Sequence, residues 1–368
     1  MSDRKRVGVV LFQLGGPDSP AAIEPFLYNL FCDPDIIPLG PLGVVLRKPL
    51  AWYISSRRVK TVSHHYDEIG GQSPIRLLTE RQGRKLAAAL QPRVEPRVVI
   101  AMRYWHPLTA EAVAALNGLS LDQLVLLPLY PHYSFATTGS SLKEWNRVYR
   151  PGSKTLPVTI IQQFYDHPLY IDAVVEKVAC SLTHFERPAD VHLVFSAHGL
   201  PLSLIEKGDP YQRQVEETVR LVMQRGAQVA FRHPEFPSQV VGSPRGRRGG
   251  WPAAFTLCYQ SKVGRAKWLE PSLTATLEDL ARGGKKHLLI IPIAFVTEHI
   301  ETLHEINIEA REEVEKLGVE QFEMMPAVGD SPRFIDTLAD LVLHAAGCRS
   351  RCPDACQMSS RGRPAKSA

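Results

Sequence analysis

Residues 191–201 read VHLVFSAHGLP, and this stretch decides the fold. Its first half is apolar at successive positions, which is typical of a strand buried on both faces of a parallel sheet. Gly199 and Pro201 end the strand and leave His198 at its carboxyl end. Ligands of open α/β sheets bind at this end of the strands. His198 is therefore a candidate functional residue, although a histidine at a turn is often only a hydrogen-bonding group.

Short apolar runs of the same kind recur along the chain, at residues 7–14, 98–104, 124–130, 158–164, 254–259, 287–295 and 322–325. Amphipathic stretches of helical length separate them, at residues 76–90, 168–183, 211–224, 271–282 and 301–317. This alternation predicts an α/β fold in which helices cover both faces of parallel sheets. The strands fall into two groups of about four, which predicts two doubly wound units.

The length of 368 residues also fits two domains. We predict an N-terminal α/β domain at 1–180, a second α/β domain at 181–330, a helix at 331–347 and a cysteine-containing tail at 348–368.

Composition excludes disordered and fibrous proteins, because 44% of residues are hydrophobic and 22% are charged. The net charge of +5 selects no class of partner by itself, and we expect no nucleic acid among the partners. The first apolar run is short and no small-residue cleavage site follows it, so it reads as a strand rather than a signal peptide. We expect a cytoplasmic protein, with peripheral contact at the inner face of a membrane as the alternative.

Two segments interrupt the pattern. Residues 36–60 are apolar but contain Pro38, Pro41 and Pro49, which we expect to prevent one long helix. Residues 226–251 include GSPRGRRGG, a composition that predicts an unstructured surface loop.

Common cofactor and nucleophile motifs are missing from the sequence: it has no GxG, GxxxxGK[ST], GxSxG or HExxH. A second feature, IPIAFVTEHIETLHEINIEAREEVEK at residues 291–316, carries more chemistry. Thr297 is placed to cap a helix in which Glu301, Glu305 and Glu309 recur every four residues. Two readings stay open: a solvated acidic face, or metal binding at Glu301 beside His299.

Eight blocks of this sequence resemble ferrochelatase, in the order of that family. They are LFQLGGPDSP at 11, FLYNLFCDPDII at 26, IGGQSPI at 69, RYWHPLT at 103, LYPHYSFATTGSS at 129, SAHGLP at 196, TLCYQSKVGRAKWLEPS at 256 and AFVTEHIETLHEI at 294. The resemblance implies an enzyme of haem biosynthesis, a lyase that inserts Fe²⁺ into protoporphyrin IX. It also implies two similar Rossmann-like chelatase domains with the active-site cleft between them.

The resemblance assigns roles to individual residues. His198 and Glu301 match the iron-site residues of the family, and His299 matches the histidine of its HxE motif. The remaining matches are to porphyrin-contacting positions: Leu14, Arg103, Tyr104, Ser261 and Trp268. Metal insertion needs a base for two pyrrole protons, and whether His198 or Glu301 supplies it stays open. Two other functions stay open as well: metal insertion into coproporphyrin or another tetrapyrrole, and non-catalytic haem or porphyrin carriage.

In this family the region equivalent to residues 36–60 forms an apolar lip around the active-site mouth. Its basic residues could contact an anionic membrane. They are Arg47, Lys48, Arg57, Arg58 and Lys60. The alternative is a core loop with a solvated basic end. The oligomeric state stays open.

Three cysteines cluster near the end of the chain, Cys348, Cys352 and Cys356. Some ferrochelatases hold a two-iron, two-sulfur cluster through three such cysteines and one internal cysteine, and four thiolates suit that cluster. Phe135 occupies the internal position of animal relatives. We therefore expect Cys180 as the fourth ligand, ahead of Cys32 and Cys258.

Overall fold

The computed structural model describes residues 4–37, 39–40, 43–150, 156–230, 250–262 and 266–348. Most of the predicted loop at 226–251 and all of the tail beyond Cys348 lie outside the described residues, as do Cys352 and Cys356.

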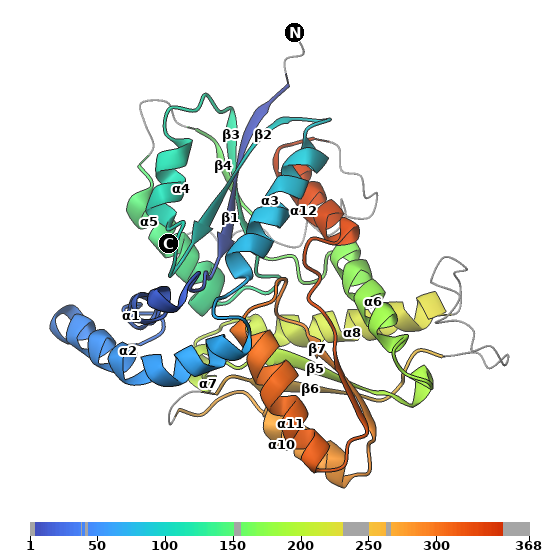
Figure 1. The fold of residues 1–368 in the computed structure, drawn as a ribbon. Helices are drawn as coiled ribbons and strands as arrows, with labels where there is room; N and C mark the ends of the chain where they lie inside the picture. Colours follow the sequence, from blue (N-terminus) through green and yellow to red (C-terminus); the bar gives the residue numbers. More distant parts are fainter. Residues whose placement is uncertain are drawn as a thin grey trace.

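Two four-stranded parallel sheets are present in the described part of the chain (Figure 1). The first has the order β2-β1-β3-β4, with β1 at Arg6–Gln13, β2 at Glu95–Met102, β3 at Gln123–Pro128 and β4 at Val158–Ile160. The second has the order β6-β5-β7-β8, with β5 at His192–His198, β6 at Phe255–Gln260, β7 at His287–Pro292 and β8 at Gln321–Met324. The predicted strands and their grouping are confirmed.

Helices accompany both sheets. Those of the first half are α1 at Ile23–Phe31, α2 at Gly43–Glu68, α3 at Ile75–Leu90, α4 at Thr109–Leu116, α5 at Ser140–Val148 and α6 at Pro168–Leu182. Those of the second half are α7 at Leu202–Glu206, α8 at Tyr211–Ala230, α10 at Leu273–Arg282, α11 at Arg311–Lys316 and α12 at Pro332–Ala345. Wider π-helical turns occur at η3, Phe135–Gly139, and η5, Glu301–Ala310, and short 3₁₀ turns at η1, Pro20–Ala22, and η4, Pro188–Asp190.

One apolar core connects the two sheets. It contains Val9 and Leu11 of β1 together with Leu193 and Phe195 of β5, and the helices α6, α8 and α12 contribute further buried side chains. Burial of this shared surface stabilises both halves at once, since the hydrophobic effect scales with apolar area removed from water. The proposed division at residues 180–181 stays a prediction. The chain does pass from the first sheet to the second there, because α6 ends at Leu182 and β5 begins at His192.

Helix α2 corrects the expectation for residues 36–60. It runs for 26 residues with Pro49 inside it, so proline does not break the segment. Proline in a helix interior costs about 3 kcal/mol. Apolar packing offsets that cost, because Ala51 and Tyr66 of α2 are buried against Phe26, Leu27 and Phe31 at α1. Figure 1 shows α2 extending away from the body of the molecule, with α1 beside it.

The segment after β7 also differs from the expectation. Thr297 does not cap the helix, because η5 begins at Glu301 with Ile300 at its N-cap. The Thr297 hydroxyl instead lies 3.4 Å from the Gln13 amide Nε2 of the first half. η5 is a π-helix, a form whose hydrogen bonds join residues five apart and which occurs frequently at functional sites.

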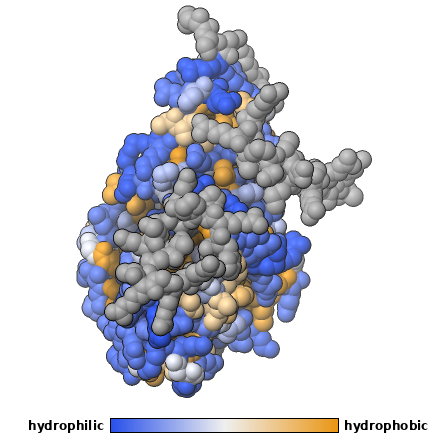
Figure 2. All heavy atoms as spheres, turned by 90° about the vertical axis from the view of Figure 1, so that its right-hand side faces the viewer, coloured by the Kyte–Doolittle hydropathy of each residue, from blue (hydrophilic) through white to orange (hydrophobic). Residues whose placement is uncertain are grey.

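Most of the visible described surface in Figure 2 is hydrophilic, with apolar residues in small groups among polar ones. Figure 2 looks at the right-hand side of Figure 1, whereas α2 lies at the left. Several large apolar side chains of α2 are exposed, led by Val45 at 75% and Trp52 at 63%.

Candidate active site

His198 is the last residue of β5, paired in register with Gln260 at the end of β6. Its Nδ1 lies 2.6 Å from the Gly199 carbonyl oxygen. A carbonyl can only accept, so Nδ1 carries a proton, and Nε2 is the ring nitrogen that can gain or lose one. This nitrogen lies 3.7 Å from Oε1 of Glu301, and about a third of the side chain is exposed. The strand end thus presents an available nitrogen next to a carboxylate.

Glu301 lies between two histidines. Its Oε1 faces His198, and its Oε2 is 3.3 Å from Nε2 of His299. The other nitrogen of His299 is 3.2 Å from the Thr297 carbonyl, which orients the ring. Burial raises the pKa of Glu301, but the positive charges that His198 and His299 carry when protonated, together with the hydrogen bond from His299, outweigh it and lower the pKa to about 2. Glu301 is therefore an ionised carboxylate at neutral pH.

A second carboxylate, Glu305, follows one turn later on η5. Its Oε1 accepts a hydrogen bond of 2.7 Å from the Ser261 backbone N–H, and its Oε2 accepts one of 2.5 Å from the Ser261 hydroxyl. Gln260 donates through Nε2 to the Glu301 carbonyl at 3.0 Å and to Glu305 Oε2 at 3.3 Å. Burial raises the pKa of Glu305, and the nearby Glu301 charge adds to that rise against the opposing hydrogen bonds of Ser261. Glu301 therefore favours its ionised form, whereas Glu305 binds a proton more readily than an ordinary glutamate does.

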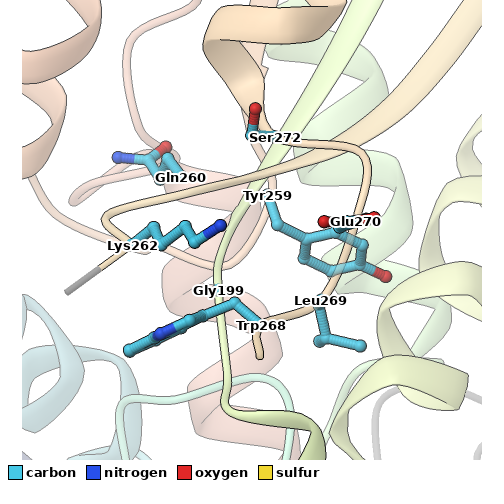
Figure 3. A pocket seen from close by; sticks show the side chains of 8 residues that line it. All are labelled: Gly199, Tyr259, Gln260, Lys262, Trp268, Leu269, Glu270 and Ser272. Carbon is cyan, nitrogen blue, oxygen red and sulfur yellow. The ribbon is translucent and has the colours of Figure 1, made fainter. Parts of the chain in front are cut away.

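A pocket opens beside the end of β5 (Figure 3). Its lining residues are Gly199, Tyr259, Gln260, Lys262, Trp268, Leu269, Glu270 and Ser272. Figure 3 shows the Trp268 indole alongside Gly199, with the Lys262 side chain on the same side of the pocket. A Cβ added at Gly199 would lie 2.9 Å from the Gln260 carbonyl and 3.3 Å from the Trp268 ring. Only glycine therefore lets the chain pass so close to this indole.

Arg103 and Tyr104 follow β2 and meet at one buried carboxylate, Asp33. Arg103 Nη2 lies 2.8 Å from Asp33 Oδ2, and the Tyr104 hydroxyl donates to the same oxygen at 2.7 Å. Ser140 donates to this oxygen at 2.7 Å and accepts from Arg103 Nε at 2.8 Å. Burial raises the pKa of Asp33, but the Arg103 charge and these hydrogen bonds lower it below its usual value. This network fixes the segment after β2.

The two halves meet at the candidate site. Leu14 and Tyr104 of the first half share an apolar cluster with Ile300, the residue before Glu301. Tyr66 of α2 is buried in the same cluster, where burial raises its pKa and the Glu301 charge raises it further. Residues that follow β1 and β2, together with Tyr66 of α2, therefore lie beside the start of η5, which carries Glu301.

Among the residues predicted from the sequence, His198, Glu301 and His299 lie together, and Trp268 and Ser261 lie beside them. Leu14 and Tyr104 lie across the contact between the halves, and Tyr104 is almost fully buried. Sequence reasoning did not assign Asp33, Tyr66 or Glu305 to the site. The four-residue spacing of Glu305 from Glu301 could have indicated that both face the site. Asp33 could not be found in this way, because its partner Tyr104 lies about 70 positions away in the sequence.

Of the cysteines that the structure describes, Cys180 and Cys348 lie far apart. Helices α6 and α12 are antiparallel, because His167 at the start of α6 contacts Asp340 while Glu176 contacts Arg333 at the start of α12. Cys180 therefore lies near the start of α12 and Cys348 lies beyond its end. The 15 residues from Arg333 to Cys348 correspond to about 20 Å of helix. This separation is a correction to the choice of Cys180 as a cluster ligand beside Cys348.

Comparison with known proteins supplies the family. The family model described as Ferrochelatase matches residues 6–346. The chain belongs to the ferrochelatase family. It is 46% identical over 341 residues to the ferrochelatase of Citrifermentans bemidjiense, covering 93% of this chain and 99% of that protein. It is 45% identical over 341 residues to the ferrochelatase of Picosynechococcus sp., and this match covers 92% of this chain and 82% of that protein.

A solved structure, SirB from Bacillus subtilis with Fe³⁺, shares the fold, with a TM-score of 0.50 and 11% identity. The superposition covers 93% of this chain and 96% of SirB. The family assignment confirms the resemblance and the two-domain chelatase fold. It also confirms the prediction of an enzyme of haem biosynthesis with ferrochelatase activity. No helix in the described residues is long and apolar enough to cross a membrane.

Proposed function

We propose that this protein inserts Fe²⁺ into protoporphyrin IX to form protohaem, with His198 as the proton acceptor. One observation carries the proposal: Nδ1 of His198 contacts the Gly199 carbonyl, which leaves Nε2 as the nitrogen that can accept a proton, 3.7 Å from the Glu301 carboxylate. When Fe²⁺ enters the ring, the two pyrrole nitrogens each lose a proton and bind the metal, so charge is balanced by the release of two protons. A positioned imidazole is suited to take such a proton near neutral pH.

Glu301 supports this division of roles. A carboxylate with a pKa of about 2 is a weak proton acceptor but a strong anion, so it stabilises the imidazolium that His198 becomes. The same carboxylate, with His198, offers oxygen and nitrogen ligands to the Fe²⁺ substrate. His299 holds the carboxylate from its other side. Glu305, whose pKa is raised, is the better placed carboxyl group to receive a proton in turn.

The porphyrin-contacting positions divide into two kinds. Leu14 and Trp268 offer partly exposed apolar surface for a flat macrocycle. Arg103, Tyr104 and Ser261 direct their polar atoms into the protein, toward Asp33 and Glu305. We assign these three a positioning role, holding the walls of the site in place.

The competing functions make different demands on these residues. A porphyrin carrier needs no ionised carboxylate beside an imidazole lone pair, because binding alone transfers no proton. A coproporphyrin chelatase must accommodate additional carboxylates on its substrate, which need cationic or polar partners. The carboxylate of Glu301 beside the His198 imidazole therefore favours a chelatase over a carrier. The choice between protoporphyrin and coproporphyrin depends on the cationic and polar groups around the pocket.

Anaerobic incubation of the purified protein with Fe²⁺ tests the function. Protoporphyrin IX and coproporphyrin are offered separately, and loss of free-base porphyrin fluorescence is followed with formation of the haem absorption band. We expect faster turnover of protoporphyrin IX. Porphyrin binding without loss of free base identifies a carrier, and faster turnover of coproporphyrin identifies the other chelatase.

Membrane contact through α2 completes the proposal. The helix exposes Val45, Leu46, Trp52 and Tyr53. Lys48, Arg57 and Lys60 are exposed on the same helix. Aromatic side chains favour the membrane–water interface, and each cation near an anionic surface contributes about 1 kcal/mol. Such a helix suits a cytoplasmic protein docked on the inner face of an anionic membrane, where an apolar porphyrin is delivered.

The iron–sulfur cluster stays a prediction from resemblance, because the described cysteines do not supply four thiolates to one place. Cys180 is remote from Cys348, and Cys258 is buried inside β6 of the second sheet. No step of the reaction is routed through a cluster. Iron and acid-labile sulfide analysis of anaerobically purified protein, with Cys352→Ser and Cys180→Ser variants, tests the prediction. Loss of both elements in the first variant alone supports a cluster without Cys180.

A further inference from the structure

Strands β5 and β7 separate at the point where the second sheet presents His198. They stay paired in register as far as Ser196 and Pro292, and the Ile293 N–H still donates to the Ser196 carbonyl at 2.9 Å. The chain after β7 then turns away from β5, because the Phe295 N–H donates to the Pro292 carbonyl at 3.4 Å. In a continued parallel ladder that N–H would donate to the His198 carbonyl. The turn therefore removes the ladder partner of His198.

Two buried tyrosines supply hydrogen bonds where these strands separate. The Tyr211 hydroxyl of α8 donates to the His198 carbonyl at 3.0 Å. The Tyr170 hydroxyl of α6 donates to the Ile293 carbonyl at 3.1 Å. Burial raises the pKa of both hydroxyls, so each remains a donor at neutral pH. Because a buried carbonyl without a donor costs free energy, the two hydroxyls stabilise the separated strand ends.

The start of α8, which carries Tyr211, is held by the first half of the chain. Asp209 accepts from the Tyr211 N–H at 3.0 Å through Oδ1. Its Oδ2 accepts from the Ser134 hydroxyl and from the Phe135 N–H, both at 2.8 Å. The His132 ring lies edge-on to the Tyr211 ring, with centroids 5.8 Å apart and planes 80° apart. A buried carboxylate and an aromatic contact therefore hold Tyr211 against the segment that follows β3.

The peptide unit between His198 and Gly199 is held at both ends. Its carbonyl accepts from Tyr211, and its N–H donates to the Gln260 carbonyl at 2.8 Å. This unit leads to the Gly199 carbonyl, which lies 2.6 Å from Nδ1 of His198. Glycine restricts its own backbone torsions little, so these hydrogen bonds fix the orientation of the unit. Without the Tyr211 hydroxyl, the unit is held at one end only, and the imidazole loses its alignment toward Glu301.

We propose that Tyr211 is a positioning residue for iron insertion, whose hydroxyl fixes the His198–Gly199 peptide unit and thereby the direction of the His198 imidazole. The inference rests on the proposed role of His198 as proton acceptor. Tyr211 acts through His198, because its hydroxyl is bonded to the backbone carbonyl and its ring is buried in the core. A misplacement of about 1 Å can lower a rate by about a hundredfold. We therefore expect Tyr211 to affect the insertion step and not porphyrin binding.

Removal of single hydroxyls tests the proposal. Tyr211→Phe and the matched control Tyr170→Phe each leave one strand-end carbonyl of the same core without its donor, so their unfolding temperatures should fall by similar amounts. Each protein, in excess over protoporphyrin IX, is mixed anaerobically with Fe²⁺, and loss of free-base fluorescence then reports a single insertion. We expect insertion to be at least about fivefold slower in Tyr211→Phe than in Tyr170→Phe. Porphyrin affinity, from fluorescence titration, should stay within about twofold of wild type in both.

A restored donor separates positioning from packing. Tyr211→4-aminophenylalanine returns an N–H donor to the place of the hydroxyl and should bring insertion to within about twofold of the wild-type rate. A smaller difference between the two phenylalanine variants, or no recovery with the amine, would overturn the proposal. With wild type active and His198→Ala inactive, such a result leaves the proposed function intact. Wild-type protein that binds porphyrin without inserting iron would overturn the proposed function and this inference with it.

Discussion

At the scale of single residues, the His198 imidazole and the Glu301 carboxylate differ in what each can do with a proton. The lone pair of His198 is available because the other nitrogen is bound to a carbonyl. The charge of Glu301 is retained because two histidines surround it. From this difference we propose that His198 accepts the proton and Glu301 stabilises the resulting charge, a distinction that the sequence left open.

The lowered pKa of Glu301 predicts a pH-dependent contribution to stability. Its folded pKa of about 2 lies below the ordinary value of 4.5, so folding favours the ionised form. The contribution is fully present above about pH 4.5 and is lost as pH falls toward 2. Because a quarter of the side chain is exposed, we expect a contribution on the order of 2 kcal/mol.

Urea unfolding of wild type and Glu301→Gln measures this contribution between pH 6 and 3. The difference in unfolding free energy should be largest at the upper end and shrink toward the lower end. Glu312→Gln, an exposed change farther along, should show no such trend. A difference for Glu301→Gln that stays constant across this range would contradict the pKa assignment.

Activity should also distinguish the carboxylates of η5. Glu301→Gln removes the charge beside His198 without changing shape, and we expect at least a hundredfold loss of iron insertion, the scale of losing one electrostatic contact to a transition state. Glu309→Gln should matter much less, because Glu309 faces His304 rather than His198. Steady-state rates with saturating Fe²⁺ provide the comparison. Equal losses in both variants would show that the inner carboxylate is misassigned.

At the scale of elements, the buried Asp33 network joins three segments: the end of α1, the segment after β2 and the start of α5. The Asp33 side chain is fully buried and that of Arg103 is 18% exposed. Removing one member of such a pair leaves an uncompensated charge. The network thus ties α1, and α2 packed on it, to the first sheet.

We therefore expect Asp33→Asn to lower the unfolding free energy by about 3–5 kcal/mol. Asp35→Asn is a matched control, because Asp35 pairs with the exposed Lys143 and should change stability by about 0–1 kcal/mol. Denaturant unfolding followed by tryptophan fluorescence measures both variants. Similar losses in the two would show that the Asp33 pair does not hold the segment.

The proposed membrane contact lies on α2. Replacement of Arg57, Arg58 and Lys60 by serine should weaken binding to anionic vesicles, and added salt should do the same through screening. Trp52→Ser should weaken binding to anionic and neutral vesicles alike, since it removes apolar contact instead of charge. Co-sedimentation with vesicles of defined composition gives the result. Equal binding of wild type to neutral and anionic vesicles would exclude the electrostatic part.

The strands were predictable from sequence because each buried strand is a local apolar run, such as RVGVVLFQ at β1. His198 was predictable because parallel strands place their last residues at one edge. The continuity of α2 through Pro49 could not be predicted, because packing against α1 overrides the local tendency of proline to break a helix. The π-helical form of η5 and the partners of Asp33 could not be predicted either, since both depend on contacts between distant segments.

At the scale of the whole molecule, the shared core and the contacts across it determine where the two halves of the site meet. Gln82 of α3 donates to the carbonyls of Val296 and Gly329 in the second half, and Arg81 and Lys85 pair with Asp330. These contacts hold α3 of the first half against the segments that follow β7 and β8 in the second half. In the proposed mechanism, porphyrin binding draws on surfaces of both halves, whereas His198 is the group that accepts the proton.

The most direct test of this account is therefore the His198→Ala variant, measured for both porphyrin binding and anaerobic Fe²⁺ insertion. Fluorescence titration with protoporphyrin IX should give an affinity within a few fold of wild type, while turnover falls to less than a tenth. A variant that keeps more than a tenth of wild-type turnover, a loss of less than about 1.4 kcal/mol of transition-state stabilisation, would contradict the role assigned to His198.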